Sequence, residues 1–280
     1  MQHKKSNTDD ILPMNDFFGW KRHPFADTYV QRQRWLPEGD TRKLGTIKRL
    51  LHNGKSCALC GPSGVGKTTL IHALIAELDK NVYLPVMLPY AGHPRNGLTR
   101  VLAQALGVDV KGRGMPLISR IQQHIETLSG NGNPRYPVLI IDDAQRVEAD
   151  SLWDLCSLLF QTNRQMVAAS LILAGDDNLA KQLELYVMVP IRSRLTGIIK
   201  IDPMNEYETR LFILSRLKNA EAPADLFAEE AIELIAGYTR GNRRGIMNTA
   251  TVALEEAYYH NEKNVTAETI YNSEWFNESE

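Results

Sequence analysis

The chain has 280 residues, of which 43% are hydrophobic and 23% are charged, so it can bury a core and is not a disordered chain. Its 32 basic and 33 acidic residues give a formal net charge of −1. Any nucleic-acid surface must therefore be a local patch. No apolar run approaches a membrane span, and the polar start MQHKKSNTDD lacks the apolar region of a signal peptide. We expect a cytoplasmic protein with no membrane partner.

Residues 1–40 are polar and rich in proline and aromatic residues, which predicts an N-terminal arm. Its segment FFGWKRHPFADT, from Phe17 to Thr28, is aromatic-dense for an exposed tail and should dock on a folded body. It could cover an adenine, dock on a neighbouring subunit or pack on its own core. The tail NSEWFNESE sets Trp275 and Phe276 among acids, either as a hook for a partner protein or folded back on the preceding helices.

Five short apolar segments alternate with helical patterns between residues 41 and 203. A helix is predicted from Thr41 to Asn53, and further helices over 98–106, 117–128 and 151–162. The strands are KSCALC, NVYLPVML, VLIID, ASLILAG and GIIKID. This alternation predicts an α/β fold with a five-stranded parallel sheet sandwiched by helices.

After Pro203 the pattern is helical only, with helices predicted over 206–218, 228–238, 243–259 and 267–272. Residues 204–280 are therefore interpreted as a helical lid domain and C-terminal tail, attached to an α/β core of residues 41–203.

Three cysteines, Cys57, Cys60 and Cys156, form an odd set that favours reduced thiols. Cys57 and Cys60 have CxxC spacing but lie three apart on a predicted buried strand, so they point to opposite faces. No second Cys or His pair has metal spacing. We interpret these cysteines as structural.

The strongest motif is GPSGVGKT, which matches G-x-x-x-x-G-K-[ST] between a predicted strand and a predicted helix. Its residues are Gly61, Pro62, Ser63, Gly64, Val65, Gly66, Lys67 and Thr68, followed by Thr69. Glycines let the backbone N–H groups point at phosphate oxygens, and the helix N-terminus adds its dipole. Lys67 should neutralise the β and γ phosphates of ATP, and Thr68 should hold Mg²⁺.

A second motif, VLIIDD, ends an apolar strand in two carboxylates. Asp142 should arrive beside the Gly-rich loop and bind magnesium directly or through water. Asp143 stands where a base could orient the attacking water. The alternative is that Asp143 only caps the next helix.

Together, the Gly-rich loop, LIIDDAQ, LILAGDDNL and the helical tail resemble an AAA+ ATPase. Within that class the chain is most similar to the ExeA-like group and the transposition ATPases of the TniB, TnsC, IstB and MuB types, and FFGWKRHPF resembles the F-G-x-x-x-x-P-F opening of ExeA-like proteins. The resemblance spans residues 15–260. It implies that Asp142 is the Walker B ligand, and that Asp143 replaces the usual glutamate with a shorter arm, which suits a slow switch.

The same resemblance implies roles for residues further along. Asp176 falls at the sensor-one position, which is usually a neutral polar residue. Arg194, with Arg192 as the alternative, would reach a neighbouring subunit's γ-phosphate, whereas the plain alternative is surface salt bridges. Arg244, rather than Arg243, matches the sensor-two arginine of the lid.

Two Gly-rich loops carry a few polar and basic residues: His93, Arg95 and Asn96 in one, Lys111 and Arg113 in the other. Such loops can grip phosphates without base specificity. In the transposition ATPases, loops at matching places line a filament and follow the DNA backbone. The alternative is ordinary solvated surface loops.

The resemblance implies an ATP-dependent regulator of transposition that forms a ring or filament on double-stranded DNA. It would recruit or activate a transposase, with a target-selection protein as a further candidate partner, and hydrolysis of ATP would release it. The alternatives are an ExeA-like secretion-system assembly ATPase and a helicase-loader-type ATPase. In ExeA-like proteins a membrane span and a cell-wall-binding region follow the ATPase domain, and the 280 residues contain neither, which counts against that alternative.

Overall fold

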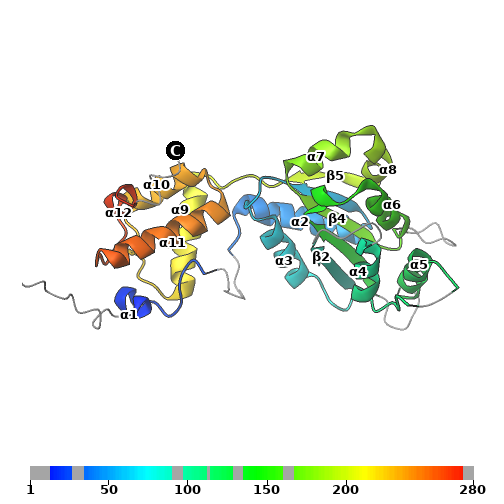
Figure 1. The fold of residues 1–280 in the computed structure, drawn as a ribbon, viewed down its shortest axis with the longest axis horizontal. Helices are drawn as coiled ribbons and strands as arrows, with labels where there is room; N and C mark the ends of the chain where they lie inside the picture. The colour runs from blue at the N-terminus through cyan, green and yellow to red at the C-terminus, as the bar shows by residue number, and fades with distance from the viewer. Residues whose placement is uncertain are drawn as a thin grey trace, which may run out of the picture. The chain divides into compact units, whose positions relative to one another are not determined.

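The computed structural model describes residues 13–26, 35–89, 97–111, 114–128, 135–159 and 167–273. These residues divide into two compact units. The sheet unit is Glu38–Asp202, and the helical unit combines the described residues before 38 with those after 202. Figure 1 shows both, and each is described separately below.

The sheet unit contains five parallel strands in the order β2-β3-β4-β1-β5. They are β1 (Ser56–Cys60), β2 (Tyr83–Pro89), β3 (Tyr136–Asp142), β4 (Ser170–Gly175) and β5 (Leu195–Lys200). β4 lies between β1 and β3, so the carboxyl ends of these three strands are neighbours. The fold class predicted from the alternating strands and helices is confirmed.

Helices cover both faces of this sheet, and its strands β1 and β4 are accordingly buried along their whole length. Ala58, Cys60, Leu139 and Ile141 share one hydrophobic cluster with one group of helices. That group is α4 (Gly97–Ala105), α5 (Leu117–Leu128), α6 (Ala149–Ser157), α7 (Asp177–Glu184) and α8 (Val189–Arg192). On the other side, α2 (Glu38–His52) and α3 (Lys67–Glu77) contact β1 and β4 (Figure 1).

Some element boundaries differ from the predicted ones. α2 begins at Glu38 rather than Thr41, because Glu38 and Asp40 place negative charge in its first turn. α7, α8 and the short 3₁₀ turns η1 (Ala144–Arg146) and η2 (Tyr186–Met188) were not predicted. They are too short for a clear periodic pattern. α6 begins at Ala149, and residues 160–162 of its predicted extent lie outside the described residues.

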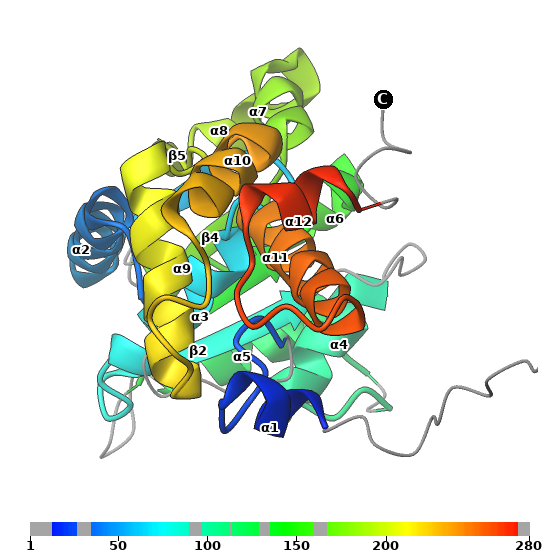
Figure 2. The same ribbon diagram turned by 90° about the vertical axis from the view of Figure 1, so that its left-hand side faces the viewer.

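The helical unit contains α1 (Met14–Phe18), α9 (Glu206–Ala220), α10 (Glu229–Thr239), α11 (Arg243–Tyr259) and α12 (Ala267–Tyr271), as Figure 2 shows. Phe17, Phe18, Trp20 and Phe25 are buried in the same hydrophobic cluster as α9–α12. Of the three alternatives for this aromatic segment, the structure shows it packed on the chain's own helices.

Polar contacts hold that N-terminal segment in place. Arg216 of α9 donates from Nε to Pro24 O at 2.7 Å and from Nη2 to Ala26 O at 3.0 Å. Lys263 donates to Phe17 O at 2.8 Å, and its ammonium lies 3.7 Å from the centroid of the Phe17 ring. Three backbone carbonyls of residues 13–26 therefore accept hydrogen bonds from side chains 190 to 246 positions away.

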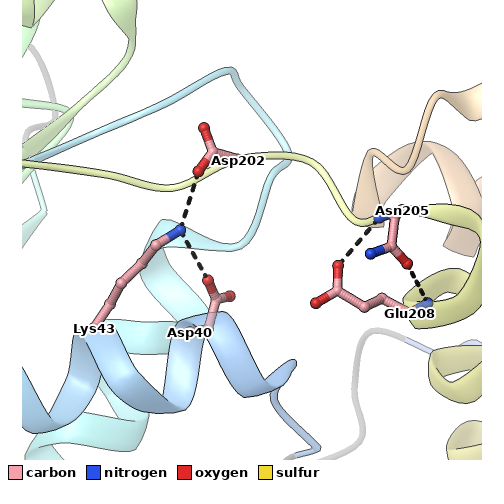
Figure 3. A network of polar contacts seen from close by, with 5 residues as sticks. All are labelled: Asp40, Lys43, Asp202, Asn205 and Glu208. Atoms are coloured by element: carbon pink, nitrogen blue, oxygen red, sulfur yellow. Dashed lines mark hydrogen bonds and ion pairs between the residues drawn. The ribbon is translucent and has the colours of Figure 1, made fainter.

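Two local polar motifs flank the boundary between the units (Figure 3). On the sheet side, Lys43 Nζ lies 3.2 Å from Asp202 Oδ2 and 3.6 Å from Asp40 Oδ1. On the helical side, Asn205 and Glu208 exchange hydrogen bonds of 2.8 and 3.1 Å in a capping box that begins α9.

Within the described ranges, no helix combines the length and apolar character needed to cross a bilayer.

Candidate functional site

The Gly-rich loop lies at the carboxyl edge of the sheet, where β1, β4 and β3 end side by side. Gly61 N donates to Gly175 O at 3.3 Å, which joins the start of the loop to the end of β4. Ligands of open α/β sheets bind in the crevice outside the carboxyl ends of the strands. The loop and the two acidic strand ends therefore share one edge.

The backbone of the loop requires glycine, since Gly64 and Gly66 have φ of +80° and +109°. Gly66 is also the N-cap of α3, and no side chain caps that helix. An uncapped helix N-terminus after a curled loop suits an anion such as phosphate.

Lys67 is only 8% exposed, and its ammonium donates to Gly61 O at 2.8 Å and Pro62 O at 2.9 Å. Burial lowers the pKa of Lys67, while the nearby carboxylates oppose that shift, Asp142 most strongly. Two neutral carbonyls thus hold the Lys67 ammonium over its own loop. Phosphate oxygens could replace them, and the ammonium would then pair with a negative charge.

Thr68 and Asp142 meet directly: Thr68 Oγ1 donates to Asp142 Oδ2 at 2.7 Å across 74 positions of sequence. A hydroxyl and a carboxylate are oxygen ligands of the kind that Mg²⁺ takes. No group of three or more His, Cys, Asp or Glu among the described residues could hold a metal by itself. The pair therefore fits a magnesium ion that completes its coordination with phosphates and water.

Asp143 follows with a left-handed backbone, φ +53°, and an exposed side chain. It occupies the N-cap position of η1, but its side chain makes no capping hydrogen bond. Its Oδ1 instead accepts from Gln145 Nε2 at 3.3 Å. The Asp143 carboxylate is therefore held by the side chain of Gln145 and not by a backbone N–H of η1.

Asp176 is the residue directly after β4, and it caps α7. Its Oδ1 accepts from Asn178 N at 2.9 Å, and its own N–H donates to Gln145 Oε1 at 3.3 Å. The structure thus gives Asp176 a local role that the sequence analysis did not predict. Gln145 lies in the LIIDDAQ segment and had no predicted role, yet it contacts both acidic segments.

The predicted arginines lie on two different units. Arg192 ends α8 and Arg194 immediately precedes β5, and both are exposed on the sheet unit. In the helical unit, Arg244 is exposed in the first turn of α11, whereas Arg243 is buried. Exposure leaves Arg192, Arg194 and Arg244 accessible to a ligand or a neighbouring chain.

Of the predicted DNA-binding residues, only Lys111 is described: it is exposed, and its N–H donates to Asp109 Oδ1 at 2.9 Å. His93, Arg95, Asn96 and Arg113 lie outside the described residues, as do Trp275 and Phe276 of the tail.

The three cysteines are buried free thiols. Burial raises the pKa of Cys57 to about 12 and that of Cys60 to about 11, so both thiols are protonated and poor nucleophiles at neutral pH. This geometry is consistent with their structural interpretation.

Comparisons with known proteins agree with this architecture. Residues 49–183 match a family model described as an AAA domain. A search of curated protein sequences returned no match.

Similar solved structures share the fold at low sequence identity. The Aeropyrum pernix ORC2 protein, solved in ADPNP-ADP complexes, has a TM-score of 0.68 at 15% identity, covering 90% of this chain and 71% of that one. CDC6P from Pyrobaculum aerophilum has a TM-score of 0.68 at 19% identity, covering 86% and 67%. The Aeropyrum pernix ORC1 protein, solved in complex with DNA, has a TM-score of 0.63 at 19% identity, covering 89% and 67%. The chain therefore has the AAA+ P-loop fold, and its residues 49–183 are similar to an AAA domain.

Proposed function

We propose that the chain hydrolyses ATP to ADP and phosphate at this edge of the sheet, and that ATP drives its assembly on duplex DNA as a regulator of transposition. The observation that carries the nucleotide site is the 2.7 Å hydrogen bond between Thr68 and Asp142, which joins the two motifs that phosphate and magnesium require. The proposed role in transposition rests on the sequence resemblance to the TniB, TnsC, IstB and MuB types.

The chain's own residues supply binding and proton transfer. The loop amides and the Lys67 ammonium bind the β and γ phosphates. Thr68 and Asp142 would hold the magnesium ion. Magnesium, when bound, neutralises the charge that develops on the phosphate oxygens. Asp143 orients a water molecule and accepts its proton as the oxygen attacks the γ phosphorus and ADP leaves. The short arm of Asp143 suits slow turnover.

Assembly is proposed to bring a neighbouring chain's Arg194 to the γ-phosphate, with Arg192 as the alternative. The segment before these arginines supports a protein contact. Leu185, Tyr186 and Val187 are 55%, 92% and 52% exposed. Consecutive exposed apolar residues beside charged ones are typical of an interaction surface. Arg244 and Asp176 are proposed to sense the bound nucleotide.

DNA contact is proposed for the two Gly-rich loops, through His93, Arg95, Asn96, Lys111 and Arg113. With a formal charge of −1, one chain has few cations to offer. An oligomer multiplies weak backbone contacts into strong, salt-sensitive binding. The dependence of DNA binding on ATP would then follow from the dependence of assembly on ATP.

The test is fluorescence anisotropy of a labelled random-sequence duplex with ATP, a non-hydrolysable analogue, ADP or no nucleotide. We expect binding only with ATP or the analogue, and weaker binding as salt rises. Lys67→Ala should abolish it, whereas the control Lys48→Ala, a partly exposed lysine of α2 that pairs with Glu77, should not. An absence of DNA binding under every nucleotide condition would refute the proposal and favour the secretion-system alternative.

A helicase-loader-type ATPase is the second candidate, which the fold likeness to the ORC and CDC6 structures favours. Activity assays with a purified transposase and with a purified replicative helicase separate the two. Stimulation of strand transfer by the ATP-bound protein supports the regulator of transposition. Stimulation of helicase loading alone supports the second candidate.

A further inference from the structure

Gln145 connects two acidic segments that come from different strands. Its side-chain amide donates from Nε2 to Asp143 Oδ1 at 3.3 Å, and its Oε1 accepts from the N–H of Asp176 at 3.3 Å. Asp143 follows β3 and Asp176 follows β4. One amide therefore uses its donor on one segment and its acceptor on the other, in a geometry that neither a carboxylate nor an apolar side chain could reproduce.

Contacts with β4 and α7 hold Gln145 in place. A Cβ at Gly175 would lie 2.7 Å from Gln145 Oε1 and 2.8 Å from Leu179, so glycine is needed for the amide to come this close. Gln182 of α7 donates to the main-chain carbonyl of Gln145 at 3.0 Å. η1 also packs against α7 and β4. Gln145 is thus anchored to α7 through its backbone and to the end of β4 through its side chain.

We propose that Gln145 is a positioning residue that aims the carboxylate of Asp143 and couples it to the start of α7. This proposal rests on the hydrolytic part of the proposed function. Asp143 has one methylene fewer than the usual glutamate and a left-handed backbone, so its reach depends on which way its short side chain is held. Gln145 supplies that constraint. A movement of α7 would pass through Gln182 and Gln145 to Asp143.

Two substitutions separate the contacts. Gln145→Leu removes both side-chain hydrogen bonds at similar volume. Gln145→Glu keeps an acceptor for Asp176 N–H but loses the donor to Asp143 and places a like charge beside it. The matched control is Gln104→Ala, which alters an exposed glutamine of α4. ATP turnover in the presence of duplex DNA, ATP affinity and hydrogen exchange at the Asp176 amide are measured for each.

Both Gln145 variants should lower kcat by about 10²-fold, the cost typical of a misplaced catalytic group, with ATP affinity unchanged. Exchange at the Asp176 amide should rise in Gln145→Leu and stay protected in Gln145→Glu. A kcat retained in Gln145→Glu but lost in Gln145→Leu would reduce Gln145 to an anchor of α7 and overturn the proposal. Wild-type turnover that neither variant changes would also overturn it while leaving the proposed function intact. A wild type with no turnover would overturn both.

Discussion

The carboxyl edge of the sheet and the core of the helical unit use buried cations in different ways. Lys67 lies against two carbonyls of its own loop with acidic side chains nearby. Arg216 is equally buried, at 7% exposure, but its guanidinium satisfies the carbonyls of Pro24 and Ala26. Arg216 therefore stabilises the packed N-terminal segment. Lys67 instead lies where the oxygens of an anionic ligand can replace the two carbonyls that it contacts.

The backbone shows the same contrast. At the edge, a helix without a side-chain cap begins directly after Gly66, and Asp143 adopts a left-handed conformation. In the helical unit, α9 and α12 begin with capping boxes at Asn205 and Thr266. Capping satisfies helix termini internally, while an open terminus leaves N–H groups for a ligand. Substitutions in the first region should therefore change chemistry, and those in the second should change stability.

The largest effect is expected for Arg194→Ala. If Arg194 completes a neighbour's site, its loss should lower turnover by about 10³-fold while a single chain still binds ATP. Steady-state turnover and nucleotide titration at the same protein concentration measure the two quantities. The matched control is Arg192→Ala. A large loss of turnover in Arg192→Ala and none in Arg194→Ala would assign the contact with the γ-phosphate to Arg192. Wild-type turnover in both variants would show that neither arginine makes it.

Arg216→Ala tests the other side of the comparison. Two charge-assisted hydrogen bonds are lost, so the free energy of unfolding of the helical unit should fall by about 3 kcal/mol. Urea unfolding followed by circular dichroism measures the change. The control Lys218→Ala alters an exposed cation on the same helix and should have little effect. Unchanged stability in Arg216→Ala would mean that this buried cation does not hold the N-terminal segment.

The smallest effect is a pH dependence confined to the helical unit. Burial, and then the nearby Arg216, lowers the pKa of His23 below its usual 6.5. His23 Nδ1 accepts from Phe25 N at 3.2 Å, which also requires the neutral ring. The unfolded chain therefore binds the proton more tightly, and stability should fall as pH drops below about 6.5.

His23→Asn retains an acceptor without a titrating group, so it should flatten that pH dependence. Hydrogen exchange of α9 at pH 7.5 and 5.5 provides the measurement, and His52→Asn, an exposed histidine of the sheet unit, is the control. A pH dependence that persists in His23→Asn would place its origin elsewhere.

The sequence was informative where one local pattern determined the structure. The strands were predictable because β1 and β4 are buried along their whole length and are apolar after their first residue, a serine in each. The Gly-rich loop was predictable because its glycines, lysine and threonine have a fixed spacing. The start of α2 was predicted three residues late, because propensity alone does not weigh the charges of Glu38 and Asp40.

Contacts set by the three-dimensional fold could not be predicted in this way. The role of Gln145 depends on β4 lying next to β3, which brings Asp176 within reach of a residue 31 positions earlier. The packing of residues 13–26 depends on Arg216 and Lys263 of distant helices. The aromatic composition indicated that this segment docks, but it carried no information about where.

The most direct measurement is titration of a fluorescent ATP analogue, with magnesium, into the wild type, Lys67→Ala and the control Lys48→Ala. The account predicts saturable binding by the wild type and the control, and no detectable binding by Lys67→Ala with its fold intact by circular dichroism. Equal affinity in all three proteins would contradict the claim that the loop of residues 61–68 holds the triphosphate.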